Sequence, residues 1–286
     1  MTLAHSSIEA NSIHLHVVQA GPLEGNPVIL LHGFPDIWYC YRFTIPVLAR
    51  RGYRVIIPDQ RGYNLSDKTG PYDVITLCQD IAALQDALHV SKSHLVGHDW
   101  GGGLAWTFAA LYPERVQRLV IINAPHLQAL RDTYHHHPIQ LVRSLYILFF
   151  QIPWLPEWSL RARNFLLLAR TISAIDSHNM TEKDIDLYRQ AWSQIGALSA
   201  MLGWYRAALQ SKESQWLLNL PPLVVLQPTL VIWGEEDPYL DRACNETLPR
   251  YVPDLRVHYL PGANHWPMIA RPEEVNALIL GHLANT

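Results

Sequence analysis

An aspartate at a tight strand-to-helix turn is the side chain in this sequence best suited to act as a nucleophile. It is Asp99, in the stretch Gly97-His98-Asp99-Trp100-Gly101. The pattern G-x-S-x-G after a buried strand presents a serine, and aspartate replaces it here. The glycines allow the turn, and amides at the start of the next helix favour the ionised carboxylate. Such a carboxylate can attack a saturated carbon and form an alkyl ester. The alternative is a glycine-rich turn whose aspartate only caps a helix.

Two further side chains suited to catalysis follow later predicted strands. Asp237 comes after residues 229–233, in the stretch WGEEDP, and His265 comes after residues 256–260, in the stretch GANHW. The order along the chain is then nucleophile, acid, histidine. A histidine oriented by an acid can take a proton from water, so that hydroxide attacks the ester carbonyl at Asp99. A turn aspartate and a loop histidine without catalytic roles are the alternative.

Several motifs in this order resemble those of the α/β-hydrolase superfamily, and specifically those of its epoxide hydrolases. They are HGFPD (32–36), DQRGYNLSDK (59–68), GHDWGG (97–102), YILFFQIPWLPE (146–157), LGWYR (202–206), GEEDPYL (234–240) and GANHW (262–266). The resemblance implies the α/β-hydrolase fold, a mostly parallel sheet flanked by helices with an inserted, mainly helical lid. It also implies a soluble epoxide hydrolase-like activity that converts a hydrophobic epoxide to a vicinal diol with water.

The resemblance assigns roles to four more residues. The backbone N–H groups of Phe34 and Trp100 would form the oxyanion hole that holds the tetrahedral intermediate. Tyr146 and Tyr205, in the two lid motifs, would protonate or hydrogen-bond the epoxide oxygen. Tyrosine suits this task because its reference pKa of ~10 keeps it protonated at neutral pH while it can still protonate an alkoxide. Only a folded lid can bring the two tyrosines together, since they are far apart in the sequence.

Two other functions stay open at this point. A haloalkane or haloacid dehalogenase would use the same triad of aspartate, acid and histidine, but a halide leaves without a proton, so the tyrosine pair favours the epoxide. A non-catalytic, ligand-binding member of the fold is less favoured because all three triad residues are present. Serine esterase chemistry is disfavoured because Asp99 replaces the serine.

Aromatic residues are expected to line the substrate pocket, although aromatics at this density would equally pack a lid onto its core. The candidates are Trp38, Phe149, Trp204 and Trp266. We expect no cofactor. We also expect no metal, because the consecutive side chains of His135, His136 and His137 point in different directions and cannot readily share one ion. Asp59, Arg61 and Asp67 are interpreted as a charge network that braces loops.

The elements needed to position these residues alternate along the chain. Apolar runs at 28–31, 54–57, 94–96 and 119–122 predict buried parallel strands, and residues 12–19 predict a half-exposed strand. Helical spacing at 77–88, 100–112 and 273–283 predicts helices between and after them. Residues 126–226 read as a helical cap, or lid, inserted in a core formed by residues 1–125 and 227–286.

The composition agrees with a large core and an uncharged ligand. Of the 286 residues, 49% are hydrophobic and 16% are charged, and the formal net charge is -3. This balance excludes intrinsic disorder, and it lacks the excess of basic residues that binding to nucleic acid or to an anionic membrane would favour. The three cysteines are widely spaced, and no apolar stretch reaches the ~20 residues of a membrane helix. We therefore expect a cytoplasmic protein that acts on a small hydrophobic substrate; the sequence leaves a homo-oligomer open.

Overall fold

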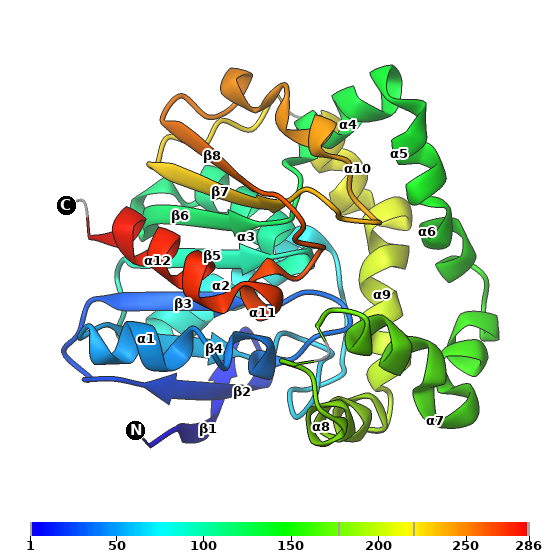
Figure 1. Cartoon of the computed structure of the whole chain (residues 1–286), viewed down its shortest axis with the longest axis horizontal. Coiled ribbons are helices and arrows are strands. Elements are labelled where there is room, and N and C mark those ends of the chain that lie inside the picture. Colours follow the sequence, from blue (N-terminus) through cyan, green and yellow to red (C-terminus); the bar gives the residue numbers. More distant parts are fainter. Residues whose placement is uncertain (1, 177, 220, 285–286) are drawn as a thin grey trace.

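The strands of the described chain form one eight-stranded sheet, which occupies the left half of the view in Figure 1. The computed structural model describes residues 2–176, 178–219 and 221–284. The strands are β1 (Ala4–Ala10), β2 (Ile13–Ala20), β3 (Pro27–Leu31), β4 (Arg54–Pro58), β5 (Ser93–His98), β6 (Val116–Ile122), β7 (Thr229–Gly234) and β8 (Leu255–Leu260). Their order across the sheet is β1-β2-β4-β3-β5-β6-β7-β8.

The sheet is mostly parallel, as the sequence predicts. Strands β4, β3, β5, β6, β7 and β8 pair in parallel, whereas β2 pairs with β1 and β4 in antiparallel fashion. The central strands are largely buried and mainly apolar because helices cover both of their faces. The sequence analysis missed β1, a half-exposed edge strand whose residues AHSSIEA carry too few apolar side chains to stand out.

Helices cover both faces of this sheet. In Figure 1, α1 (Ile45–Arg50) and α12 (Pro272–Leu283) lie in front of it, while α2 (Val74–Ala87) and α3 (Trp100–Leu111) lie behind it. Asp73 caps α2, because its side chain accepts a hydrogen bond from the Thr76 amide. The short elements of the core are α11 (Pro267–Ala270) and the 3₁₀ turns η1 (Trp38–Tyr41), η2 (Pro113–Arg115), η3 (Arg242–Asn245) and η4 (Leu248–Arg250).

All the α-helices between β6 and β7 belong to one segment, residues 127–219, which we call the cap segment. They are α4 (Leu127–His136), α5 (Pro138–Arg143), α6 (Leu145–Phe150), α7 (Leu155–Ser173), α8 (Glu182–Trp192), α9 (Ala197–Gln210) and α10 (Lys212–Asn219). In Figure 1, α5, α6, α9 and α7 stand to the right of the sheet, beyond the ends of its parallel strands. The division into a core and a lid at residues 126 and 226 stays a prediction, and its outer limits, residues 1 and 286, lie outside the described residues.

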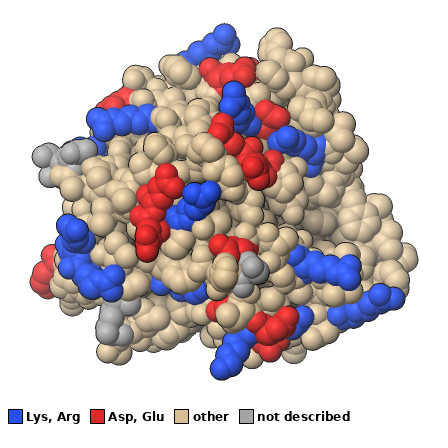
Figure 2. Space-filling view, in the orientation of Figure 1, with Lys and Arg blue, Asp and Glu red and all other residues tan. Residues whose placement is uncertain are grey.

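Charged side chains are spread unevenly over the face shown in Figure 2. Acidic and basic residues alternate over the core, whereas the right-hand side, where the cap segment lies, is largely uncharged. No helix in the described part of the chain combines the length and hydropathy needed to cross a lipid bilayer.

Candidate active site

Asp99 stands at the turn between β5 and α3, with backbone angles φ 50° and ψ -122° that a non-glycine residue seldom adopts. Two glycines make this turn possible. A Cβ at Gly97 would lie 2.4 Å from the Gly101 oxygen, and one at Gly101 would lie 2.3 Å from the Leu31 oxygen. Larger residues at these positions would push the helix away from the sheet. The turn therefore presents the Asp99 side chain at the start of α3.

The loop after β3 approaches the Asp99 carboxylate with a backbone donor. The Phe34 amide donates to Asp99 Oδ1 over 2.7 Å. A Cβ at Gly33 would lie 2.3 Å from the same oxygen, so glycine is required for this approach. Trp100 opens α3, and the amides of a helix start have no partner inside the helix. Of the two amides predicted to form the oxyanion hole, that of Phe34 thus contacts the nucleophile, and that of Trp100 follows it directly in the chain.

His265 lies between two carboxylates. Its Nδ1 is 2.6 Å from Asp237 Oδ2, and its Nε2 is 3.4 Å from Asp99 Oδ2. Burial lowers the pKa of His265, but the charges and hydrogen bonds of Asp237 and Asp99 outweigh burial and raise it to about 10. Burial raises the pKa of Asp99, but the hydrogen bond and charge of His265 outweigh burial and hold it below its usual range. The arrangement therefore favours a protonated His265 between the carboxyl groups of Asp237 and Asp99.

The acid Asp237 is held by four hydrogen bonds. Its Oδ1 accepts from the amides of Tyr239 and Leu240, at 2.8 and 3.0 Å, and its Oδ2 accepts from Asn123 Nδ2 at 2.8 Å as well as from His265. A carboxylate held this way fixes the plane and tautomer of the histidine it contacts. Sequence reasoning missed Asn123, which follows β6 and carries no motif of its own.

A third buried carboxylate, Asp36, lies behind the histidine. It accepts hydrogen bonds from Trp266 Nε1 at 2.7 Å and from the Tyr188 hydroxyl at 3.0 Å. Burial raises its pKa to about 7, against the opposing effect of these two bonds. Tyr188 belongs to α8, so Asp36 joins the cap segment to the loop after β3. These contacts give Asp36 a structural role.

The two predicted tyrosines face one cavity of about 160 Å³ together with Asp99. Tyr146 comes from α6 and Tyr205 from α9, and their ring centroids are 6.0 Å apart. Burial raises the pKa of both hydroxyl groups, so both stay protonated at neutral pH. The cavity is lined by Phe34, Pro35, Asp99, Tyr146, Phe150, Leu160, Leu167, Leu168, Thr171, Tyr205, Tyr239, His265 and Trp266.

Of the four aromatic residues predicted to line the pocket, the structure places only Trp266 in this lining. Phe149 packs beside Phe150, which does line the cavity. The Trp38 amide donates to Asp59, and the Trp38 ring packs on His5 and Tyr39. Helix rotation decides which aromatic faces inward, and a sequence motif does not reveal it.

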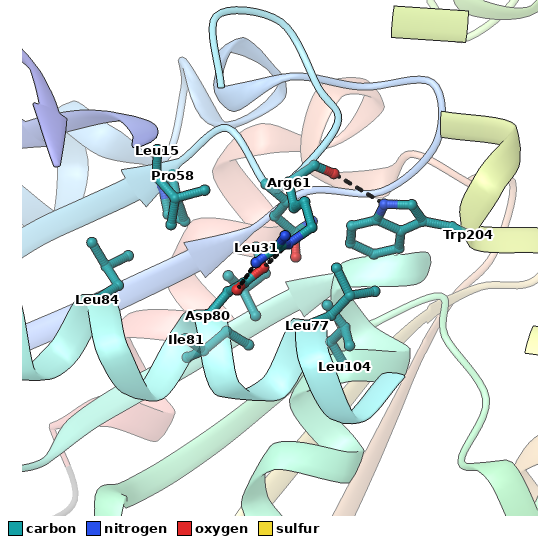
Figure 3. A pocket seen from close by; sticks show the side chains of 11 residues that line it. Leu15, Leu31, Pro58, Arg61, Leu77, Asp80, Ile81, Leu84, Leu104 and Trp204 are labelled. Carbon is teal, nitrogen blue, oxygen red and sulfur yellow. Dashed lines mark hydrogen bonds and ion pairs between the residues drawn. The ribbon is translucent and has the colours of Figure 1, made fainter. Parts of the chain in front are cut away.

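Trp204 points toward the core and away from the cavity. Its Nε1 donates to the Arg61 carbonyl oxygen at 3.0 Å, beside a small apolar gap that Figure 3 shows. The guanidinium of Arg61 pairs there with Asp80, which the predicted charge network did not include. Asp59 instead accepts hydrogen bonds from His16 and Asn64, and Asp67 accepts one from the His14 amide.

Tyr239 is a third tyrosine in the cavity, and sequence reasoning did not single it out. Its ring lies 5.3 Å from that of His265 and 5.9 Å from that of Tyr146. It stands two positions after Asp237 in the motif GEEDPYL, and this nearness to the acid is the signal that could have identified it.

Comparison with known proteins shows which family the chain resembles. Residues 26–272 match the family model described as alpha/beta hydrolase fold. The chain is 39% identical to the AB hydrolase superfamily protein YfhM of Bacillus subtilis, over 97% of each chain. It is 35% identical to human epoxide hydrolase 4, over 97% of this chain and 78% of that protein. A crystal structure of Bacillus megaterium epoxide hydrolase in complex with an inhibitor matches with a TM-score of 0.88 and 31% identity, covering 97% of this chain and 99% of that one.

Proposed function

Since the chain belongs to the epoxide hydrolases of the α/β-hydrolase superfamily, we propose that it opens a small hydrophobic epoxide to a vicinal diol through a covalent ester on Asp99. The observation that carries this proposal is the shared cavity, in which two protonated tyrosines face an ionised aspartate. An epoxide placed there would meet a nucleophile at its carbon and a proton donor at its oxygen.

In the first half-reaction, the carboxylate of Asp99 attacks one epoxide carbon. A carbon–oxygen bond to the carboxylate forms as the carbon–oxygen bond of the ring breaks. The departing oxygen takes its proton from Tyr146 or Tyr205, which leaves a neutral hydroxyl on the substrate and a tyrosinate on the protein. Tyr205 lies between Phe34 and Trp100, with ring centroids 5.4 and 5.0 Å from theirs, so its ring is fixed above the oxyanion loop.

In the second half-reaction, water hydrolyses the ester. His265 Nε2 takes a proton from water, and the oxygen attacks the ester carbonyl carbon of Asp99. The Phe34 and Trp100 amides hold the tetrahedral oxyanion, an interaction typically worth about 3–4 kcal/mol per donor. The intermediate then collapses to the carboxylic acid of Asp99, and the leaving diol oxygen takes the proton from His265. The acid ionises to the carboxylate, and its proton returns to the tyrosinate through solvent.

Ester formation itself prepares His265 for this task. Two anions, Asp237 and Asp99, raise the pKa of His265 in the resting site. Alkylation neutralises Asp99 and so removes one of them, which lowers the pKa of His265. His265 then releases its proton to solvent and becomes the neutral imidazole that acts as a base. Asp237 keeps the ring oriented throughout, over its 2.6 Å contact with Nδ1.

The lining supports a small, apolar substrate. Besides Asp99, His265 and the tyrosines, it consists mainly of aromatic and leucine side chains, with Thr171 as a further hydroxyl. A volume of about 160 Å³ suits a substrate of roughly the size of one substituted ring.

A single turnover in ¹⁸O-labelled water, with excess enzyme and styrene oxide, tests the mechanism. We expect label in the peptide that contains Asp99, while the first diol released stays unlabelled. Label that enters the first diol directly would refute the ester.

Release of bromide from 1-bromoalkanes, without diol formation from epoxides, would instead support the dehalogenase. His265→Gln should accumulate the ester, detectable as a mass increase equal to one substrate.

A further inference from the structure

The helical run formed by α5 and α6 is apolar on two opposite sides. Tyr146 and Phe150 face inward and line the cavity. On the outer side, Leu141, Leu145, Leu148 and Ile152 follow one another at helical spacing and are exposed. Leu145 and Leu148 expose 56% and 60% of their surface. A helix that is apolar all round is normally covered on every side, but this outer side has no cover within the described chain.

Two exposed tryptophans continue this surface past the end of α6. Trp154, in the turn before α7, is 73% exposed, and Trp158, in the first turns of α7, is 68% exposed. Tryptophan combines a large apolar ring with one N–H donor and is enriched where hydrocarbon meets water. We call the surface made by Leu141, Val142, Leu145, Leu148, Ile152, Trp154 and Trp158 the outer cap face.

The charged residues of the segment that carries the outer cap face, positions 133–175, are mainly basic. Glu157 is the single acidic residue between positions 133 and 175, and Arg206 neutralises it through a bidentate pair. Arg161, Arg163 and Arg170 are exposed, and none of them forms an ion pair with any residue that the structure describes. In Figure 2, Lys and Arg side chains mark the lower right, where Figure 1 places α7, and acidic side chains lie beside them at the bottom of the view, where Figure 1 places α8. The formal net charge of -3 hides this local excess.

We propose that the outer cap face docks on the surface of an anionic lipid bilayer. Leucines and tryptophans would enter the boundary between headgroups and acyl chains, and the arginines would contact anionic headgroups. A second copy of the chain fits less well, because a two-fold contact through this face would bring the unpaired arginines of both copies together. The outer cap face contains none of the proposed catalytic residues. Docking through it would place the proposed reaction at a membrane surface.

The position of the cavity gives this docking a use. Leu167 of α7 lines the cavity and is also 52% exposed, so this side chain stands between the cavity and the outside of the cap segment. Apolar epoxides concentrate in bilayers. A docked protein would therefore open its cavity close to the phase that holds its substrate.

Vesicle sedimentation of the full-length protein, without substrate, tests the docking surface. We expect binding to vesicles of phosphatidylcholine with about 30% phosphatidylglycerol, weakening as salt is raised, and much weaker binding to phosphatidylcholine alone. Two double variants, Leu145→Gln with Leu148→Gln and Trp154→Gln with Trp158→Gln, should each lower the partition coefficient about tenfold. Ile195→Gln is the matched control, because Ile195 is 96% exposed in the cap segment but lies outside this face.

Charge and self-association are separated by two further measurements. A triple variant, with Arg161, Arg163 and Arg170 each changed to Gln, should bind the anionic vesicles at least about fivefold more weakly. Light scattering after size exclusion reports the oligomeric state of each protein. Unchanged turnover of styrene oxide in buffer shows that each variant folds. Equal vesicle binding by all variants would overturn the proposal, as would no binding by the parent protein, or a parent dimer that the leucine variant dissociates.

Discussion

The guanidinium of Arg143 donates a 3.0 Å hydrogen bond to the backbone carbonyl oxygen of Asp237. A cap helix, α5, thus contacts the loop that carries the triad acid. One turn earlier, Gln140 contacts the same loop twice: its Nε2 donates to the Tyr239 oxygen at 3.0 Å, and its Oε1 accepts from the Asp241 amide at 2.7 Å. The cap segment therefore positions the acid of the triad as well as supplying two tyrosines.

Replacing Gln140 by leucine should weaken both the fold and the triad. Gln140 is buried, so the change leaves the Tyr239 carbonyl and the Asp241 amide without partners, at a cost of about 1–3 kcal/mol each in the free energy of unfolding. The loop at Asp237 loses two restraints, so we expect slower ester hydrolysis with little change in ester formation. Urea unfolding and separate single-turnover rates measure the two effects. Gln190→Leu, at an exposed position of α8, is the control; equal stability of the two variants would contradict this role.

Replacing Tyr146 and Tyr205 together by phenylalanine should abolish epoxide opening. General acid catalysis typically contributes 10²–10⁴-fold, so we expect a loss of about 10³-fold or more in the rate of ester formation. Each single variant should lose less, because the other hydroxyl still faces the cavity. Stopped-flow measurement of tryptophan fluorescence on mixing with substrate gives this rate. Tyr259→Phe, at an exposed position of β8, should match the parent protein. Turnover by the double variant within threefold of the parent would exclude the tyrosines as donors.

The pKa of His265 should fall when Asp99 is changed to asparagine. In the parent protein Asp237 and Asp99 raise it to about 10, and Asp99→Asn removes one of these anions, as the ester does. NMR titration of the His265 ring checks this shift, and an unchanged pKa would show that Asp99 does not control it.

The same shift predicts how stability depends on pH. A folded-state pKa above the ordinary value of 6.5 means that the folded protein holds this proton more tightly. The stabilisation is fully present below about pH 6.5 and is lost as the pH rises through about 10. The free energy of unfolding should therefore fall across this window in the parent protein and fall less in Asp99→Asn. Parallel curves for the two proteins would contradict the linkage.

The sequence predicted those parts of the site that depend on local patterns. Asp99 and Asp237 follow the buried parallel strands β5 and β7, and His265 follows the partly exposed parallel strand β8. Parallel strands bring such residues to one edge of the sheet. Placement in the cap segment depends instead on how helices rotate against one another. Tyr146 faces the cavity while Trp204, one position before Tyr205, points toward Arg61. No spacing rule separates these outcomes, because both faces of the cap helices are apolar.

The buried ion pair between Arg61 and Asp80 should be essential for stability and for the placement of α9. Arg61 Nε and one terminal nitrogen donate to the two Asp80 oxygens, each over 2.6 Å, and both side chains are almost fully buried (Figure 3). The Arg61 carbonyl oxygen also accepts from Trp204, which neighbours the tyrosine donor of α9. Removing one partner of a buried pair leaves an uncompensated charge.

Asp80→Ala should therefore lower the free energy of unfolding by about 3–5 kcal/mol. Asp86→Ala is the matched control, because Asp86 pairs with Arg115 at the surface, where such pairs contribute about 0–1 kcal/mol. Urea unfolding of both variants measures the difference. If Asp80→Ala retains a fold, its rate of ester formation should also fall, since α9 loses the anchor beside Tyr205. Equal stability of the two variants would contradict this prediction. It would mean that the Arg61 guanidinium, once Asp80 is gone, finds another partner or contacts water in the gap beside Trp204.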